Sequence, residues 1–291
     1  MLQLQGKTIV VAGATGTLGR NIVEELLNVG AKPRVLLRDI NKASLFEFSN
    51  AIEYFEAQAT ELESLEGLFK GVHGCISALG KTRQADKQNY WQVDYGANSH
   101  LLQMAIDAHL QFFSYVHVIG NAQQNGSQLF TAKQAFVDSL QQSPIESYVV
   151  RPSGFFSDLA EVFTMAQKGR VWLIGNGQQP VTPIHPRDLA KEVVRALLKG
   201  QRDITVGGPQ TITQDDIAKL AFSVLGQKSK TSHIPEWLIT ALLGVVSSMT
   251  PQRFWGPFEF FHEAMKNDMS APHYGKETLE NFFLELKRKK A

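Results

Sequence analysis

Short apolar segments alternate with helix-spaced apolar positions along the first half of the chain. Continuous runs of apolar and β-branched residues predict buried strands at residues 8–12, 34–37, 52–55, 74–79, 114–119 and 147–150. Between these runs, apolar residues recur three and four positions apart and predict helices at 22–30, 62–69, 93–110 and 131–140. This alternation is typical of parallel strands joined by right-handed crossovers, with helices on both faces of the sheet.

The pattern changes after residue 152. Two further short strands are predicted at 171–174 and 204–206, where they are expected to join the first sheet and interleave the two parts of the chain. Helices are predicted for most of the remainder, at 187–198, 214–225, 235–249 and 277–287. We therefore expect an α/β fold, with a Rossmann-type doubly wound parallel sheet at 1–155 and a smaller, mostly helical C-terminal substrate lobe at 156–291.

Composition and charge narrow the class of protein. Of 291 residues, 43% are hydrophobic and 20% are charged, which is typical of a globular chain and excludes a disordered one. The formal net charge is +1 and basic residues cluster only near the C-terminus, so nucleic-acid binding is not expected. The longest apolar run, 237–249, is too short to span a bilayer, and no secretory signal is visible. The single cysteine, Cys75, cannot form an internal disulfide and fits a reducing compartment. We expect a cytoplasmic protein without a transmembrane segment.

A glycine-rich loop follows the first predicted strand and opens the first predicted helix. Gly13 permits a sharp turn, Gly16 allows the backbone to approach a pyrophosphate, and Gly19 lets the helix pack closely on the sheet. Phosphates then lie at the helix N-terminus, where unpaired N–H groups favour negative charge. Thr15 and Thr17 supply further hydroxyl donors. The sequence therefore predicts dinucleotide binding; the alternative is a tight turn with a purely structural role.

The end of the second predicted strand indicates which dinucleotide is bound. An acidic side chain there accepts from the ribose of NAD, whereas a basic one pairs with the extra phosphate of NADP. The strand ends in Arg38 followed by Asp39, and a guanidinium suits a phosphate. We expect NADP(H) to be favoured over NAD(H), unless Arg38 is a surface charge paired with Asp39.

Several motifs together resemble one protein family. Five motifs follow one another in order along the chain. They are GATGTLGR at 13–20, VDY at 93–95 with Asn98 in the third predicted helix, SYVHVIG at 114–120, AKQAFVDSL at 132–140 and YVVRPSGFF at 148–156. This series resembles atypical members of the short-chain dehydrogenase/reductase superfamily, of the NmrA-like and isoflavone-reductase-like kind. The resemblance implies a Rossmann fold that binds NAD(P). It extends over nearly the whole chain but implies no particular substrate.

The resemblance also assigns cofactor contacts. It implies that the adenosine and diphosphate contact Gly13, Thr15, Gly16, Leu18, Gly19 and Arg38. It implies that the middle of the cofactor lies over Ser77, Ala78, Leu79 and Gly80. The nicotinamide end is expected to contact Lys133, Pro152, Ser153 and Phe155. Two positions depart from the family pattern. Gln58 and Ala59 replace its usual Gly-Asp, which weakens an adenine contact, and Ser153 stands where glycine is usual.

The catalytic pattern of the superfamily is incomplete. Standard members use Tyr-x-x-x-Lys and a serine, but Leu129 lies four residues before Lys133, and His117 takes the serine position. Lys133 is therefore a candidate proton donor or base if desolvation lowers its pKa; otherwise it only bonds the ribose. His117 is a second acid–base candidate because it ends a central strand; the alternative is a pocket-lining histidine without a chemical role.

Aromatic residues mark the expected substrate side. Phe156, Phe254 and Trp255 are predicted to line an apolar pocket over the nicotinamide; core packing, or a surface for a membrane or partner, are the alternatives. No metal site is expected, because His262-Glu263 is followed by Lys266 where a zinc helix needs a second histidine.

These observations lead to three hypotheses. The first is an NAD(P)H-dependent oxidoreductase, a reductase or redox isomerase, that acts on a small hydrophobic molecule without the Tyr-x-x-x-Lys pair. The second is a non-catalytic NADP(H)-binding sensor or assembly factor with a protein partner. The third is an enzyme similar to nucleotide-sugar epimerases and dehydratases, disfavoured because that chemistry also uses the tyrosine. A homodimer is left open.

Overall fold

The computed structural model of the chain describes residues 1–47, 49–81, 88–120, 126–249, 255, 259, 262–263 and 266–290. The chain divides into two compact units. The first unit comprises Met1–His117, Gln128–Arg151 and Leu189–Ile204, and the second comprises Val118–Ser127, Pro152–Asp188 and Thr205–Ala291.

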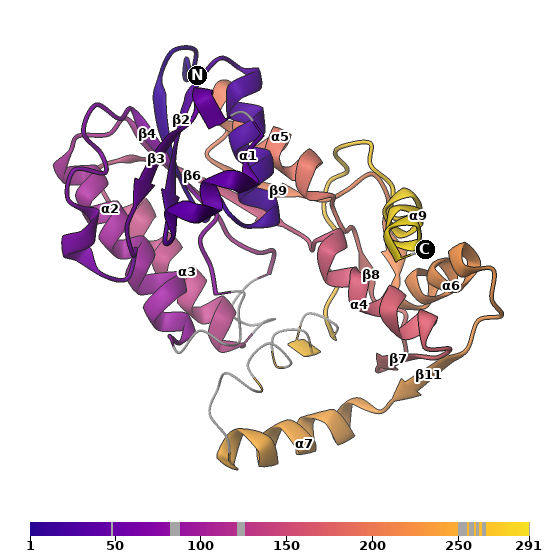
Figure 1. The fold of residues 1–291 in the computed structure, drawn as a ribbon. Coiled ribbons are helices and arrows are strands. Elements are labelled where there is room, and N and C mark those ends of the chain that lie inside the picture. Colours follow the sequence, from indigo (N-terminus) through magenta and orange to yellow (C-terminus); the bar gives the residue numbers. More distant parts are fainter. Residues whose placement is uncertain are drawn as a thin grey trace. The chain divides into compact units, whose positions relative to one another are not determined.

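A seven-stranded sheet forms the centre of the first unit (Figure 1). Its order is β3-β2-β1-β4-β5-β6-β9, and neighbouring strands from β3 to β6 pair in parallel. The strands are β1 (Thr8–Ala12), β2 (Lys32–Leu37), β3 (Glu53–Glu56), β4 (Gly74–Ser77), β5 (Phe112–Val116), β6 (Glu146–Pro152) and β9 (Asp203–Val206). This order reverses direction between β1 and β4, as in a doubly wound Rossmann sheet, so the predicted fold class is confirmed.

Helices and buried strands together form the core of the first unit. The helices are α1 (Thr17–Asn28), α2 (Asn98–Asp107) and α3 (Gln128–Gln142), and α5 (Pro186–Lys199) continues into this unit from the second. Every residue of β4 and β5 is buried, which explains why their sequences are apolar without alternation. Two predicted helices differ in form: 62–69 contains only a short 3₁₀ turn, Leu62–Leu65, and the helix at 93–110 begins as a π-helical segment, Trp91–Ala97.

The second unit is built around α4 (Phe156–Gln167), α6 (Gln214–Leu225) and α9 (Leu279–Lys290). Their apolar faces share a core with β7 (Val171–Ile174), which pairs in parallel with β11 (Thr231–Ile234). The short strands β8 (Pro180–Val181) and β10 (Ile212–Thr213) pair antiparallel. A further helix, α7 (Glu236–Met249), follows β11 after one residue (Figure 1). None of the helices that the structure describes has the length and apolar character needed to cross a bilayer.

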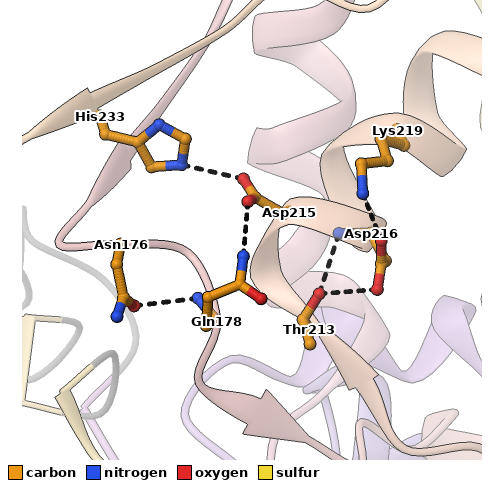
Figure 2. Close-up of polar contacts among 7 residues, drawn as sticks. All are labelled: Asn176, Gln178, Thr213, Asp215, Asp216, Lys219 and His233. Carbon is orange, nitrogen blue, oxygen red and sulfur yellow. Dashed lines mark hydrogen bonds and ion pairs between the residues drawn. The ribbon is translucent and has the colours of Figure 1, made fainter.

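Polar contacts hold β11 and the turn after β7 on the N-terminal end of α6 (Figure 2). The carboxylate of Asp215 accepts from Gln178 Nε2 at 2.9 Å and pairs with His233 Nε2 at 2.9 Å. Asn176 Oδ1 accepts from the backbone N–H of Gln178, which shapes the turn itself. The start of α7, two residues beyond β11, is therefore attached to a braced part of the second unit.

Candidate functional site

The loop between β1 and α1 can be built only with glycine at two positions. Gly13 has a φ of +76°, and a Cβ there would lie 2.7 Å from the carbonyl oxygen of Ala78, at the end of β4. A Cβ on Gly19 would clash with the carbonyl oxygen of Gly13. Gly13 lets the loop pass close to the end of β4, and Gly19 lets α1 pack closely on the loop, as the sequence predicts.

The N-terminal end of α1 is suited to an anion. Gly16 is the N-cap, no side chain caps the helix, and its first turn carries no acidic residue. The backbone N–H groups of this turn and the helix dipole therefore favour a bound phosphate. A Cβ on Gly16 would lie within 4 Å of only the Gly13 carbonyl oxygen, at 3.3 Å, so the outer side of the loop is open to a ligand.

A cleft opens in front of this loop, wholly within the first unit. Its lining residues are Gly13, Thr15, Gly16, Leu36, Arg38, Lys42, Ala57, Gln58, Ala59, Thr60, Ala78, Leu79, Gly80, Lys81, Gln88, Val93 and Ala97. Among these described residues there are three cations and no carboxylate. The apolar lining suits an adenine ring and the cations suit phosphates, so the donor set fits a dinucleotide.

The end of β2 clarifies the roles of Arg38 and Asp39. Asp39 Oδ1 accepts from the backbone N–H and the side-chain amide of Asn41, both at 3.0 Å, and so caps the following 3₁₀ turn. Arg38 lines the cleft together with Lys42, which the sequence analysis did not single out. The only sequence signal for Lys42 is its position in the turn after the second strand.

Lys133 is part of a buried network behind the cleft. Its Nζ lies 3.1 Å from Asp94 Oδ1 and donates to the Tyr115 hydroxyl at 3.1 Å. The Asp94 side chain is fully buried, and its other oxygen accepts from the backbone N–H of Lys81. A Cβ on Gly80 would lie 2.9 Å from Asp94 Oδ1 and 3.2 Å from Lys133 Nζ, so the ion pair lies directly behind this glycine of the cleft.

This network opposes the expected lowering of the Lys133 pKa. Burial alone would lower that pKa, but the Tyr115 hydroxyl and the Asp94 carboxylate outweigh it and raise the pKa above its ordinary value. The raised pKa favours a protonated Lys133, suited to donating hydrogen bonds rather than to acting as a base, while burial also raises the pKa of its partner Asp94. Tyr115 supplies a hydroxyl beside this lysine from β5, but burial raises the pKa of Tyr115 to about 12.

His117 is also electrically neutral. Burial, reinforced by the charge of Lys133, lowers the pKa of His117 to about 3. Its Nε2 lies 3.0 Å from Gln134 Oε1, an acceptor only, so Nε2 carries the proton and Nδ1 is left as an acceptor. This differs from the expected acid–base role near neutral pH, because the buried ring cannot take up a second proton there.

A separate apolar pocket lies wholly within the second unit. Its lining residues are Val118, Pro152, Ser153, Gly154, Phe155, Asp158, Leu159, Pro180, Val181, Pro183, Gln214, Asn267 and Met269. The turn at 152–155 is held in place because the Ser153 hydroxyl donates to the Thr182 carbonyl and the backbone N–H of Ile184 donates to the Gly154 carbonyl. Three of the four residues that the family resemblance assigns to the nicotinamide end, Pro152, Ser153 and Phe155, thus line an apolar pocket.

One carboxyl group interrupts the apolar lining. Asp158 lies in the first turn of α4, at the rim of the pocket. Asp158 is exposed to solvent at this position, and partial loss of hydration beside the apolar lining raises its pKa to about 6, although the backbone N–H of Phe155 acts in the opposite direction. Asp158 carries no distinctive sequence signal, because an acidic residue in a first helical turn is ordinarily a helix-capping feature.

The other predicted site residues do not line the cleft. Thr17, Leu18 and Gly19 form the first turn of α1, whose backbone N–H groups suit a phosphate, whereas Ser77 is buried and donates to Asn98 Oδ1 at 2.5 Å. Phe156 is buried in the core of the second unit, against His185 and Phe282, rather than in the pocket. Trp255 lines a different cavity with Leu243 and His262. Phe254 lies outside the described residues. No group of His, Cys, Asp or Glu among the described residues could hold a metal ion.

Comparison with known proteins identifies the class of the first unit. A family model described as NAD(P)H-binding matches residues 13–200. The photosystem II assembly factor Ycf39 of Trieres chinensis is 26% identical over 236 residues, which cover 80% of the chain and 73% of that protein. The chloroplastic divinyl chlorophyllide a 8-vinyl-reductase of Zea mays is 27% identical over 323 aligned positions, which cover 97% of the chain and 79% of that protein.

Solved structures show the same fold. Quinone oxidoreductase QOR2 from Escherichia coli, in complex with NADPH, superposes with a TM-score of 0.74 at 17% identity, covering 96% of the chain and 99% of that structure. UDP-glucose 4-epimerase from Thermus thermophilus, in complex with NAD, gives a TM-score of 0.63 at 15% identity, covering 78% and 86%.

The family model covers more than half of the chain and confirms the NAD(P)H-binding class, and the solved structures confirm the fold. The curated relatives include both a reductase and an assembly factor, which correspond to the first two hypotheses from the sequence.

Proposed function

The chain belongs to the NAD(P)H-binding family, and from this premise we propose that it is an NADPH-dependent reductase of a small, conjugated hydrophobic molecule. The observation that carries this proposal is that Pro152, Ser153 and Phe155, which the family resemblance assigns to the nicotinamide side, line an apolar pocket. Such a pocket suits a hydrophobic acceptor. The relatives named as vinyl reductases support the same reaction class.

In this proposal the first unit binds the cofactor, which supplies a hydride when bound. The N-terminal turn of α1 holds the diphosphate, and Arg38 with Lys42 holds the 2′-phosphate. Lys133 is a positioning cation that donates to the ribose, because its pairing with Asp94 keeps it charged. Because the chain lacks the Tyr-x-x-x-Lys pair, its acceptor has to be one whose reduction does not depend on a tyrosine acid. This favours a conjugated double bond or a quinone over an isolated ketone.

The choice of NADP over NAD gives the first prediction. Changing Arg38 to alanine removes a charge-assisted contact to the 2′-phosphate, so the Kd for NADPH should rise about 30-fold while that for NADH stays unchanged. Fluorescence titration with each nucleotide measures both values. Lys32→Ala, an exposed cation at the other end of β2, is the matched control. An equal loss of affinity for both nucleotides would show that Arg38 does not recognise this phosphate.

Asp158 is proposed as the proton source in the pocket. Reduction of a conjugated double bond adds a hydride to one carbon and a proton to the other, and a carboxyl with a pKa of about 6 holds that proton in mildly acidic solution. Activity that depends on protonated Asp158 should therefore fall as the pH rises through about 6.

Asp158→Asn should reduce kcat about 100-fold at pH 5.5, roughly the pH at which Asp158 is mostly protonated, and should abolish the fall near pH 6. Glu161→Gln, an exposed carboxyl on the same helix, is the control and should leave the pH profile unchanged. A variant at position 158 that keeps both the rate and the profile excludes this role.

The proposed function itself is tested by following NADPH absorbance with divinyl chlorophyllide and with a short-chain quinone as acceptors. Turnover of either supports the reductase. A second candidate, a non-catalytic NADPH-binding assembly factor, is favoured by the buried network, because Lys133, Tyr115 and His117 are all committed to internal contacts. Tight NADPH binding without turnover, together with NADPH-dependent capture of a protein partner, would favour that candidate.

A further inference from the structure

The second unit carries an apolar helix whose outer side faces solvent. In α7 the only charged residue is Glu236, at the first position. Its inner side includes Ile239, which is buried, and Leu243, which lines a cavity with Trp255. The α7 outer face, defined here as Trp237, Leu238, Leu242 and Met249, is 46–78% exposed. Four large apolar side chains exposed on one helix favour a partner or lipid environment over water.

A cationic surface lies one strand away. Because β7 and β11 pair in parallel, with Val171 opposite Thr231, the residues before them, Arg170 and Lys230, lie at the same edge. Lys287 of α9 donates to the carbonyl of Val224 at 2.7 Å, which brings the C-terminal end of α9 to the same region. We call this surface the basic end; its exposed cations are Lys168, Arg170, Lys228, Lys230, Lys287, Arg288 and Lys289.

No acidic residue lies in the three segments that form the basic end. Residues 167–171, 225–231 and 286–290 contain lysine and arginine as their only charged residues. Although the net charge of the whole chain is only +1, these three segments together carry a local excess of positive charge. Cations at helix C-termini are favourable for the dipole, but a cluster of this size also creates a field that attracts an anionic surface.

Trp172 connects the basic end with α7. This side chain is 52% exposed on β7, and the guanidinium of Arg170 lies 5.6 Å from the centre of its ring. The four-residue strands place the basic end about 13 Å from the start of α7. Because Asp215 and His233 brace β11 on α6 (Figure 2), the starting point of α7 is fixed relative to this edge.

We propose that this surface docks the protein on an anionic lipid bilayer, with α7 lying in the plane of the headgroups and the basic end against lipid phosphates. The 14 residues of α7 extend about 21 Å, too short to span the hydrocarbon core but suited to an interfacial position. Tryptophan and arginine side chains are typical of such interfaces. A second copy of the chain is a poorer occupant, because pairing through this surface would bring two basic ends together.

Flotation of the full-length protein with vesicles tests the proposal. Vesicles of phosphatidylcholine with phosphatidylglycerol should bind at least about tenfold more tightly than phosphatidylcholine alone, and the difference should shrink at high salt. One double variant combines Trp237→Ser with Leu242→Ser, and a second combines Lys228→Gln with Lys230→Gln. Each should weaken binding to the anionic vesicles at least about tenfold. Matched controls on the first unit, Leu62→Ser and Lys70→Gln, should bind as the wild type does.

NADPH affinity serves as the folding control, because it should be the same in all of these variants. Absence of binding to anionic vesicles, or equal binding of the α7 variant, overturns the proposal. So does a concentration-dependent dimer, measured by analytical ultracentrifugation without lipid, that the α7 substitutions abolish; that result would assign the face to a second copy.

Discussion

Replacing Gly19 with alanine is expected to lower the free energy of unfolding by about 4 kcal/mol and to abolish NADPH binding. The new Cβ would clash with the Gly13 carbonyl oxygen and lie 2.6 Å from the Cα of Ala14. Both neighbours are backbone atoms, so the clash is relieved only if α1 moves away from β1. Urea unfolding followed by circular dichroism measures the stability, and a nucleotide titration measures the binding.

Gly16→Ala separates binding from folding at the same loop. Its Cβ would lie 3.3 Å from the Gly13 carbonyl oxygen and near no other atom, so the free energy of unfolding should change by less than about 1 kcal/mol. The methyl group would occupy the side of the loop open to a diphosphate, and NADPH affinity should fall at least about tenfold. Normal nucleotide binding by this variant would show that the diphosphate does not approach the loop here.

Asp94→Asn is expected to have the second large effect, a loss of about 3 kcal/mol in the free energy of unfolding. The carboxylate is fully buried and pairs with Lys133, whose side chain is 10% exposed. Removing the negative charge leaves the lysine cation buried without its counter-charge, because Tyr115 is neutral at physiological pH. Urea unfolding at neutral pH measures the loss.

A compensating variant distinguishes an unpaired charge from general damage. When Lys133→Met is added to Asp94→Asn, no uncompensated charge is left, and most of the lost stability should return. If the double variant is no more stable than Asp94→Asn alone, the ion pair is not the cause. NADPH affinity should be low in the double variant even when stability returns, because Lys133, the positioning cation, is gone.

Much of the first unit follows from local sequence alone. Buried strands such as β4 and β5 are covered on both faces, so their apolar sequences reveal them without any tertiary information. The glycine spacing of the first loop is equally local, because turn geometry and close packing act over a few residues. The weaker prediction at 62–69 was wrong in form: the apolar spacing there serves buried Leu65 and Leu68 in turns rather than a continuous helix.

The candidate site was only partly predictable. Lys133 was identified from its motif, but its charge state depends on two residues distant in sequence. These are Asp94, which lies 39 positions earlier, and Tyr115 of β5. Asp158 was missed for a similar reason, because the walls that raise its pKa come from chain segments around positions 180 and 269. Phe156 was predicted in the pocket, yet its ring packs into the core, since neighbouring positions on a helix point in different directions.

The amino-acid sequence by itself therefore determined the Rossmann architecture and the nucleotide loop, because both depend on periodicity and on residues close together in the chain. Only the tertiary structure decided which groups keep a charge, which aromatic residues line a pocket, and that α7 turns an apolar face to solvent beside a cluster of cations. Desolvation, ion pairing and exposure are set by neighbours distant in sequence, and a linear pattern carries no information about that proximity.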